Sequence, residues 1–220
     1  MGYNKGDSYE EKIFKILESK KMLAPNAKRG GSSKKPDLLF LHRSRPNSLE
    51  VKLDLKADYG QKMLKWEDGV WSWCVNDSVT QLYSELKILE YINRKSIIPN
   101  RYTVPKEEIT QDQKTEDQKN FEDVQEIDIN ALYEYYSNRN CYYIQIGDYG
   151  FYHLKKDVLN LGTPQFNCKM RLRLRAKTIH SNPIYNYGFY AVLKPYGKPN
   201  QVSPFDLEEK EDRVFPPLNP

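Results

Sequence analysis

The chain has 220 residues, a hydrophobic content of 39% and a formal net charge of +4, enough for one sizeable domain or for a core with an added half, and only weakly suggestive of a polyanionic partner. No run is long and apolar enough to cross a bilayer, and the first residues lack the apolar core of a signal peptide. Three isolated cysteines without a CxxC pair argue against zinc and favour a cytoplasmic or other reducing intracellular compartment, bacterial or phage in origin among others.

The first predicted element is a helix that begins after a cap at Asp7 or Ser8 and ends before Pro25. Its apolar face consists of Tyr9, Ile13, Phe14, Ile16 and Leu17. Glu10 and Glu11 fall in its first turn, where negative charge is favourable beside the helix N-terminus. That position explains both acids, and a second interpretation is that Glu11 reaches a cation bound beside the helix.

A basic loop rich in glycine and serine follows at residues 26–35 and leads directly into Pro36-Asp37. Such a composition is typical of a solvated loop. Freed backbone amides and cationic side chains also suit a phosphate backbone, and the neighbouring aspartate favours this second interpretation. The candidate phosphate contacts are Lys28, Arg29, Ser32, Ser33, Lys34 and Lys35.

The next two elements are predicted to form a hairpin that gathers charged side chains. Asp37 precedes an apolar strand at 38–41, and a polar connection leads to a second strand at 49–53. On this second strand Glu50 and Lys52 face outward on the same side, close to Asp37. Two carboxylates and an ammonium placed there would hold a hard cation and a water. The alternative is a hairpin whose charges merely face solvent.

Two helices, separated by a turn, are expected within residues 54–100. A short helix is predicted at Gln61–Trp66, and a longer one is capped by Ser78 and ends near Ser96. The three tryptophans lie close together around the turn at residues 67–69. That grouping suits a core or a lid better than a platform for stacking bases.

A strongly acidic stretch at residues 105–128 has almost no apolar residues, which predicts an exposed, disordered linker or insert. It divides the chain into a core at 1–100, a linker at 101–128 and a β-rich half at 129–220. In that half a short helix at 129–136, a hairpin at 141–154 and a helical turn at 155–161 are expected.

A long strand at residues 169–177 then alternates apolar with basic residues, which places the cations in one row. The row consists of Lys169, Arg171, Arg173, Arg175 and Lys177. Because like charges repel, such a row favours a bound anion such as phosphate, although a solubilising face is the alternative. A partner strand is expected at 185–193, and the proline-rich tail from Lys198 onward is expected to be extended and peripheral.

Pro36-Asp37 followed by Glu50-Val51-Lys52, after a helix that carries Glu11, resembles the PD-(D/E)XK nuclease superfamily. The resemblance covers residues 1–100. It implies an α/β (α+β) fold of the restriction-endonuclease-like type, in which a mixed β-sheet is flanked by helices. The aromatic-rich, β-containing C-terminal half would be added to this core as a DNA-contacting or recognition region.

The same resemblance implies that Asp37 and Glu50 bind Mg²⁺, with Mn²⁺ able to substitute, and that Lys52 assists the attacking water. Since Mg²⁺ prefers oxygen ligands, the carbonyl of Val51 and a substrate phosphate would complete the site. Glu11 resembles the extra helix-borne acid of several members of the superfamily.

Gln61 resembles the polar residue that some members of the superfamily place on the following helix. The implied activity is Mg²⁺-dependent hydrolysis of DNA, rather than RNA, by a sequence-specific restriction or homing type of endonuclease. The alternatives are a structure-selective nuclease such as a Holliday-junction resolvase and a non-catalytic nucleic-acid-binding protein. Twofold-symmetric cutting would require a homodimer, and no membrane partner is expected.

Overall fold

The computed structural model describes residues 5–23, 27–30, 36–94, 108–121, 126–178 and 187–220. Ser32, Ser33, Lys34 and Lys35 of the predicted phosphate contacts therefore lie outside the described residues. The chain forms two compact units: unit 1 contains residues 1–57, 132–169 and 196–220, and unit 2 contains residues 58–131 and 170–195. This division crosses the predicted boundaries at residues 100 and 128.

Unit 1 is built on a four-stranded mixed sheet with the order β1-β2-β6-β7. Its elements are α1 (Lys5–Ser19), β1 (Leu38–His42), β2 (Arg45–Lys52), α5 (Asn130–Ser137), β6 (Cys141–Ile146) and β7 (Gly150–His153). The two outer pairs are antiparallel, whereas β2 and β6 are parallel. A parallel pair requires a long crossover, and here the chain between the two strands includes residues 58–131 of unit 2.

The predicted hairpin is confirmed as β1–β2, in which Leu38 pairs with Leu49. Its connection is shorter than expected, because Arg43 and Ser44 both adopt positive φ and form a tight two-residue turn. The strand β2 consequently starts at Arg45 and not at Leu49.

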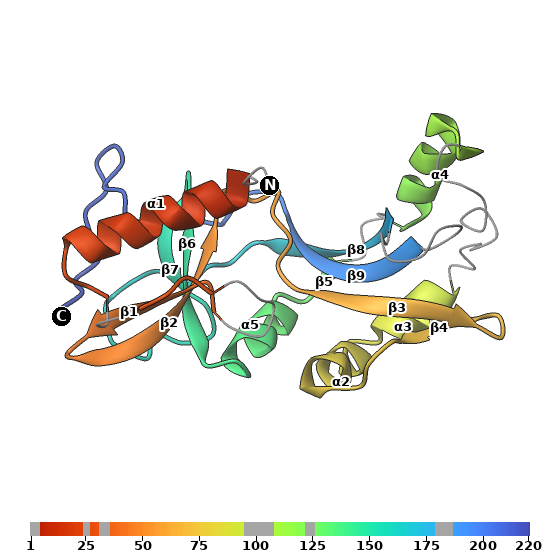
Figure 1. Ribbon diagram of the computed structural model, residues 1–220, viewed down its shortest axis with the longest axis horizontal. Coiled ribbons are helices and arrows are strands. Elements are labelled where there is room, and N and C mark those ends of the chain that lie inside the picture. The colour runs from red at the N-terminus through yellow and green to blue at the C-terminus, as the bar shows by residue number, and fades with distance from the viewer. Residues whose placement is uncertain (1–4, 24–26, 31–35, 95–107, 122–125, 179–186) are drawn as a thin grey trace. The chain divides into compact units, whose positions relative to one another are not determined.

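Helix α1 lies across one face of this sheet (Figure 1). Tyr9, Ile13 and Leu17, spaced four residues apart, form the buried stripe of the helix. They pack against alternate residues of β2, Leu49 and Val51, and against the strands on both sides. The apolar side of the predicted alternation is therefore the core of unit 1.

The C-terminal segment is part of this core, so the prediction of a peripheral tail is wrong. Gln145 on β6 is fully buried, and its side-chain amide donates to Asp206 at 2.8 Å and accepts from the Leu207 backbone at 3.2 Å. Tyr9 donates to Glu208 at 2.7 Å. Buried polar groups of the sheet and of α1 thus take their partners from residues 206–208, which fixes this segment against the sheet.

Unit 2 contains a five-stranded sheet with the order β4-β3-β9-β8-β5. Its strands are β3 (Gln61–Glu67), β4 (Val70–Trp73), β5 (Glu126–Ile127), β8 (Lys169–Thr178) and β9 (Tyr187–Tyr196). Its helices are α2 (Ser78–Glu85), α3 (Ile88–Arg94) and α4 (Gln111–Phe121). Over the described residues the chain is an α+β protein, as the broad fold prediction stated, and it contains two sheets.

Several local predictions need correction. The segment 61–66 is a strand and not a helix, because it pairs with β4 on one side and β9 on the other. The predicted helix at 78–96 is two helices, since Lys87 adopts a φ of 56° between them. The acidic stretch contains α4 and β5, although its residues 122–125 lie outside the described residues.

The segment 155–161 is an irregular turn and not helical. Asp157 organises it by accepting hydrogen bonds from the Tyr143 hydroxyl and from the backbone amides of Leu161 and Gly162. The helix at 129–136, the hairpin at 141–154 and the strand at 169–177 are confirmed as α5, β6–β7 and β8. Among the described residues, no helix combines the length and apolarity needed to cross a membrane.

Replacing Asp206 should test the role of the C-terminal segment. The Asp206→Ala variant leaves Arg213 (Nε at 3.4 Å) and Gln145 buried without their carboxylate partner, which should lower the free energy of unfolding by about 3 kcal/mol. Urea unfolding followed by circular dichroism measures this loss. The exposed Asp212 supplies the control, because Asp212→Ala should stay within about 0.5 kcal/mol of wild type. Equal stability of the two variants would contradict the assignment.

Candidate active site

Asp37, Glu50 and Lys52 converge in unit 1 where β1 begins and β2 ends. The Lys52 ammonium forms an ion pair with Glu50 and lies 3.8 Å from the nearer oxygen of Asp37. That same Asp37 oxygen accepts a hydrogen bond of 2.9 Å from the Val51 backbone amide. The side chains are only 19% exposed for Asp37, 7% for Glu50 and 15% for Lys52. The cluster is therefore largely buried, and the backbone of β2 holds Asp37 in place through the Val51 amide.

On the face of β2 that carries Glu50, a side chain of α5 contacts this carboxylate, which argues against the alternative in which the hairpin charges merely face solvent. The Tyr136 hydroxyl, on a side chain 1% exposed, donates to Glu50 Oε1 at 2.9 Å. Glu50 thus has two donors, Tyr136 and Lys52, on the same oxygen. Sequence reasoning missed Tyr136, because no local pattern links residues 86 positions apart.

Glu10, and not Glu11, is the α1 acid that interacts electrostatically with the cluster. Burial raises the pKa of Glu10, while Lys52 lowers it and Glu50 raises it. Glu11 is paired with Lys15 at 2.8 Å, and this hydrogen bond lowers the pKa of Glu11.

The positions of Glu10 and Glu11 relative to the buried stripe of the helix could have distinguished the two acids from the sequence alone. Glu10 is three residues before Ile13 and seven before Leu17, so it lies at the edge of the buried stripe. Glu11 falls outside that stripe, one turn before the exposed Lys15.

Two carboxylates lie close together in the partly buried cluster, which makes the ionised form of Asp37 unfavourable. Burial and the neighbouring Glu50 raise the pKa of Asp37 to about 7, against the opposing effect of Lys52. Burial alone would lower the pKa of Lys52, but Glu50 and Asp37 raise it above its usual value. Lys52 is therefore cationic at neutral pH, and Asp37 is close to its titration point.

A divalent cation fits this chemistry, because it would relieve the repulsion between Asp37 and Glu50. Hard cations prefer carboxylate oxygens, and both acids have an oxygen that does not face Val51, Lys52 or Tyr136 in these contacts. Within the described residues, no group of three or more His, Cys, Asp or Glu side chains is placed to hold a metal ion. Backbone carbonyls, waters or a substrate phosphate would have to supply the remaining ligands.

The described part of the basic loop lies against the cluster. The Gly30 amide donates to the Asp37 carbonyl at 2.8 Å, and a β-carbon at Gly30 would stand 2.0 Å from the Pro36 carbonyl oxygen. Only glycine allows this approach. Arg29 donates to the Asp7 carbonyl at 3.0 Å, and Lys28 is exposed. The loop is thereby tied to both α1 and the start of β1.

The other predicted contacts belong to unit 2, apart from Lys169 at the start of β8. Gln61 is the exposed first residue of β3. On β8, Lys169 is exposed and Arg171 and Arg173 are half-buried, whereas the intervening Met170 and Leu172 are buried. This confirms the predicted alternation for the first half of the row. Arg175 and Lys177 lie on the strand, but their side chains are outside the described residues.

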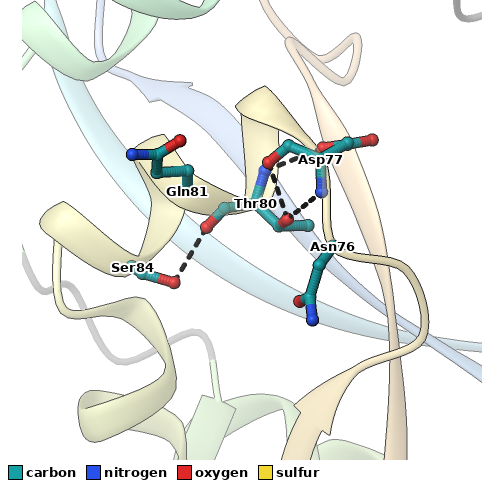
Figure 2. A pocket seen from close by; sticks show the side chains of 5 residues that line it. All are labelled: Asn76, Asp77, Thr80, Gln81 and Ser84. Atoms are coloured by element: carbon teal, nitrogen blue, oxygen red, sulfur yellow. Dashed lines mark hydrogen bonds between the residues drawn. The ribbon is translucent and has the colours of Figure 1, made fainter.

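Unit 2 also has a polar cleft of about 350 Å³ on α2, which sequence reasoning did not anticipate (Figure 2). Its lining residues are Asn76, Asp77, Thr80, Gln81 and Ser84. Asp77 and Thr80 exchange hydrogen bonds of 2.7 and 2.9 Å that cap the helix. The cap is thus Asp77, one residue before the predicted Ser78. None of the residues predicted for catalysis lines this cleft.

Comparisons of the chain with protein-family models, with curated proteins and with solved structures found no match. The interpretation of the acid–lysine cluster therefore rests on its geometry and electrostatics.

The raised pKa of Asp37 predicts a pH-dependent effect of Asp37→Asn on stability. Because the folded-state pKa of about 7 lies above the usual 3.8, the stability due to the protonated form is complete below pH 3.8 and is lost as the pH rises through 7. A neutral asparagine escapes this loss. Without divalent metal, the free energy of unfolding of the variant should exceed that of wild type by roughly 2 kcal/mol at pH 8. This difference should grow between about pH 4 and 7. Thermal unfolding across this pH range measures it, and a pH-independent difference contradicts it.

Proposed function

We propose that the chain is a Mg²⁺-dependent endonuclease that hydrolyses phosphodiester bonds in DNA. The observation that carries the proposal is the convergence of Asp37, Glu50 and Lys52 at one end of adjoining strands, with the pKa of Asp37 raised to about 7. Strongly shifted carboxylates beside a lysine are typical of catalytic sites. The mixed sheet flanked by α1 and α5 supports a restriction-endonuclease-like core.

In this proposal Asp37 and Glu50 hold the metal ion, with the Val51 carbonyl as a further candidate ligand and Glu10 in place of Glu11 as the helix-borne acid. A bound Mg²⁺, or Mn²⁺ in its place, acidifies a water and neutralises charge on the phosphate. Tyr136 fixes one oxygen of Glu50 by its hydrogen bond, and the Val51 amide fixes one oxygen of Asp37. Both ligands are thus preorganised by buried donors.

Lys52 serves as a cation and not as a base. Its pKa is raised by Glu50 and Asp37 despite burial, so the ammonium keeps its proton at neutral pH. From that position it orients the attacking water or stabilises the negative charge that builds on the phosphate in the transition state. Asp37 must be ionised to act as a ligand, so activity should rise with pH up to about 7.

Binding of the DNA backbone is assigned to the described basic loop residues, Lys28 and Arg29, and to the cations on β8. The separate sheet of unit 2 gives room for sequence recognition, which favours a restriction or homing type of enzyme over a compact junction resolvase.

A second candidate is a nucleic-acid-binding protein without catalysis. One observation favours it: within the described residues, Lys52 pairs with both carboxylates, and no third metal-ligating side chain joins them. Retained DNA binding with no metal-dependent cleavage would decide for this candidate.

Cleavage of plasmid and branched DNA with Mg²⁺ or Mn²⁺ tests the assignment. Glu50→Ala removes a metal ligand, and Lys52→Ala removes the cation beside the phosphate, so each should lower the cleavage rate by about 100-fold or more. Undiminished cleavage by both variants would contradict the assignment of Glu50 and Lys52 to the active site. Sequencing of the products would separate specific, structure-selective and non-specific cutting.

The two neighbouring acids on α1 supply a matched pair for the same assay. Glu10→Gln should lower the cleavage rate about tenfold, because Glu10 interacts with Lys52 and Glu50. Glu11→Gln carries the same chemical change at a residue paired with Lys15 and should cleave like wild type. The opposite ranking of the two variants would restore the sequence-based choice of Glu11.

Charge reversal on β8 tests the predicted phosphate contacts. The double variant Arg171→Glu and Arg173→Glu should weaken DNA binding by about 10-fold or more and flatten the dependence of affinity on salt, since fewer counterions are released. Fluorescence anisotropy at several salt concentrations measures both effects. Unchanged affinity at low salt would mean that the row is a solvated face.

A further inference from the structure

Helix α5 connects the acid–lysine cluster to an arginine that no sequence pattern singled out. Tyr136 donates to Glu50, and the ring of Tyr135 packs edge-on against the ring of Tyr136 with centroids 5.0 Å apart. Arg139, one turn later, places its guanidinium over Tyr135, 5.3 Å from the centroid, and donates to the Tyr135 hydroxyl at 3.1 Å. Two neighbouring rings thus lead from the catalytic carboxylate to Arg139.

Arg139 and the charged residues of the site affect the pKa values of the same two neighbouring residues, Tyr135 and Cys141. Burial raises the pKa of Tyr135, Arg139 and Lys52 lower it, and Glu50 raises it. Burial likewise raises the pKa of Cys141, where Glu50 and Asp37 add to the effect and Arg139 opposes it. Arg139 therefore contributes positive charge to the surroundings of Tyr135 and Cys141, where the charge of Glu50 also acts.

The chemistry of this arginine suits a phosphate. A guanidinium presents a planar fork of N–H donors that matches two phosphate oxygens, and an aromatic ring beneath it limits its motion. Tyr135 is 6% exposed and holds the guanidinium from one side, while Arg139 itself is half-buried and remains accessible to solvent. A preorganised, accessible guanidinium beside a nuclease site is favourable for binding a backbone anion.

We propose that Arg139 is a further substrate-binding residue that grips a DNA backbone phosphate next to the one that is cut. The inference rests on the proposed nuclease function. The phosphate is a flanking one, because the rings of Tyr135 and Tyr136 occupy the space that leads from Arg139 to Glu50. Arg139 holds the strand, and Asp37, Glu50 and Lys52 act on the neighbouring phosphodiester.

The test compares full-length wild type with Arg139→Gln and with Arg45→Gln, which removes the same charge from an exposed position on β2 in the same unit. The probe is a short fluorescein-labelled DNA duplex, bound without divalent metal over a series of salt concentrations and then cleaved with Mg²⁺. Arg139→Gln should raise Kd and KM about tenfold, keep kcat within about twofold and reduce the slope of log affinity against log salt by about 1. Arg45→Gln should match wild type.

Tyr135→Phe is the second variant, because it keeps all charges and removes only the hydroxyl that orients Arg139. It should raise Kd about threefold without changing the salt slope. If circular dichroism shows that Arg139→Gln does not fold, this variant decides, and an unchanged Kd then overturns the inference.

The outcomes separate the two proposals. A wild type that cleaves DNA, with Arg139→Gln indistinguishable from Arg45→Gln, overturns the role of Arg139 and leaves the nuclease function standing. A fall in kcat with unchanged Kd also overturns it, since the residue would then act on the chemistry. A wild type that neither binds nor cleaves DNA overturns the nuclease proposal and this inference with it.

Discussion

The parallel pairing of β2 with β6 is the constraint on which unit 1 depends. Its register sets Glu50 beside Ile144 and Val51 beside Gln145. On one face, Gln145 forms buried hydrogen bonds with Asp206 of the C-terminal segment and with Tyr9 of α1. On the other face, α5, which leads into β6, brings Tyr136 onto Glu50. One strand pair therefore joins the helix, the tail and the acid cluster into a single packed structure.

Electrostatics explain why this cluster stands out from the exposed ion pairs of unit 1. Surface pairs such as Lys15 with Glu11 are exposed, and pairs of that kind contribute little to stability. In the acid–lysine cluster two carboxylates share one ammonium in partial burial, so the pKa of Asp37 rises to about 7. Such an arrangement costs folding free energy, and a bound cation would relieve it. That cost is the physical reason for preferring a functional interpretation to a structural one.

Local patterns predicted the elements that carry a clear signal in the sequence. The strands β2 and β8 followed from the period of two and α1 from its apolar spacing, whereas β1 followed from an apolar run and the hairpin β6–β7 from its turn residues. The errors arose where tertiary pairing or packing decided the outcome. The segment starting at Gln61 became a strand because both its edges pair, and the tail became core because Gln145 needs Asp206. Tyr136 was missed since it reaches Glu50 only through contacts between segments far apart in the chain.

The sequence by itself determined that Asp37, Glu50 and Lys52 meet, because a short hairpin and strand alternation bring them together without any distant contact. It also determined the alternation of basic and buried residues on β8. Only the tertiary structure decided which α1 acid interacts electrostatically with the cluster, which tyrosine holds Glu50, and that the chain divides into units at residues 57 and 132. Those outcomes depend on helix phase and on pairing between strands far apart in the chain, where the free energy of packing and not local propensity selects the arrangement.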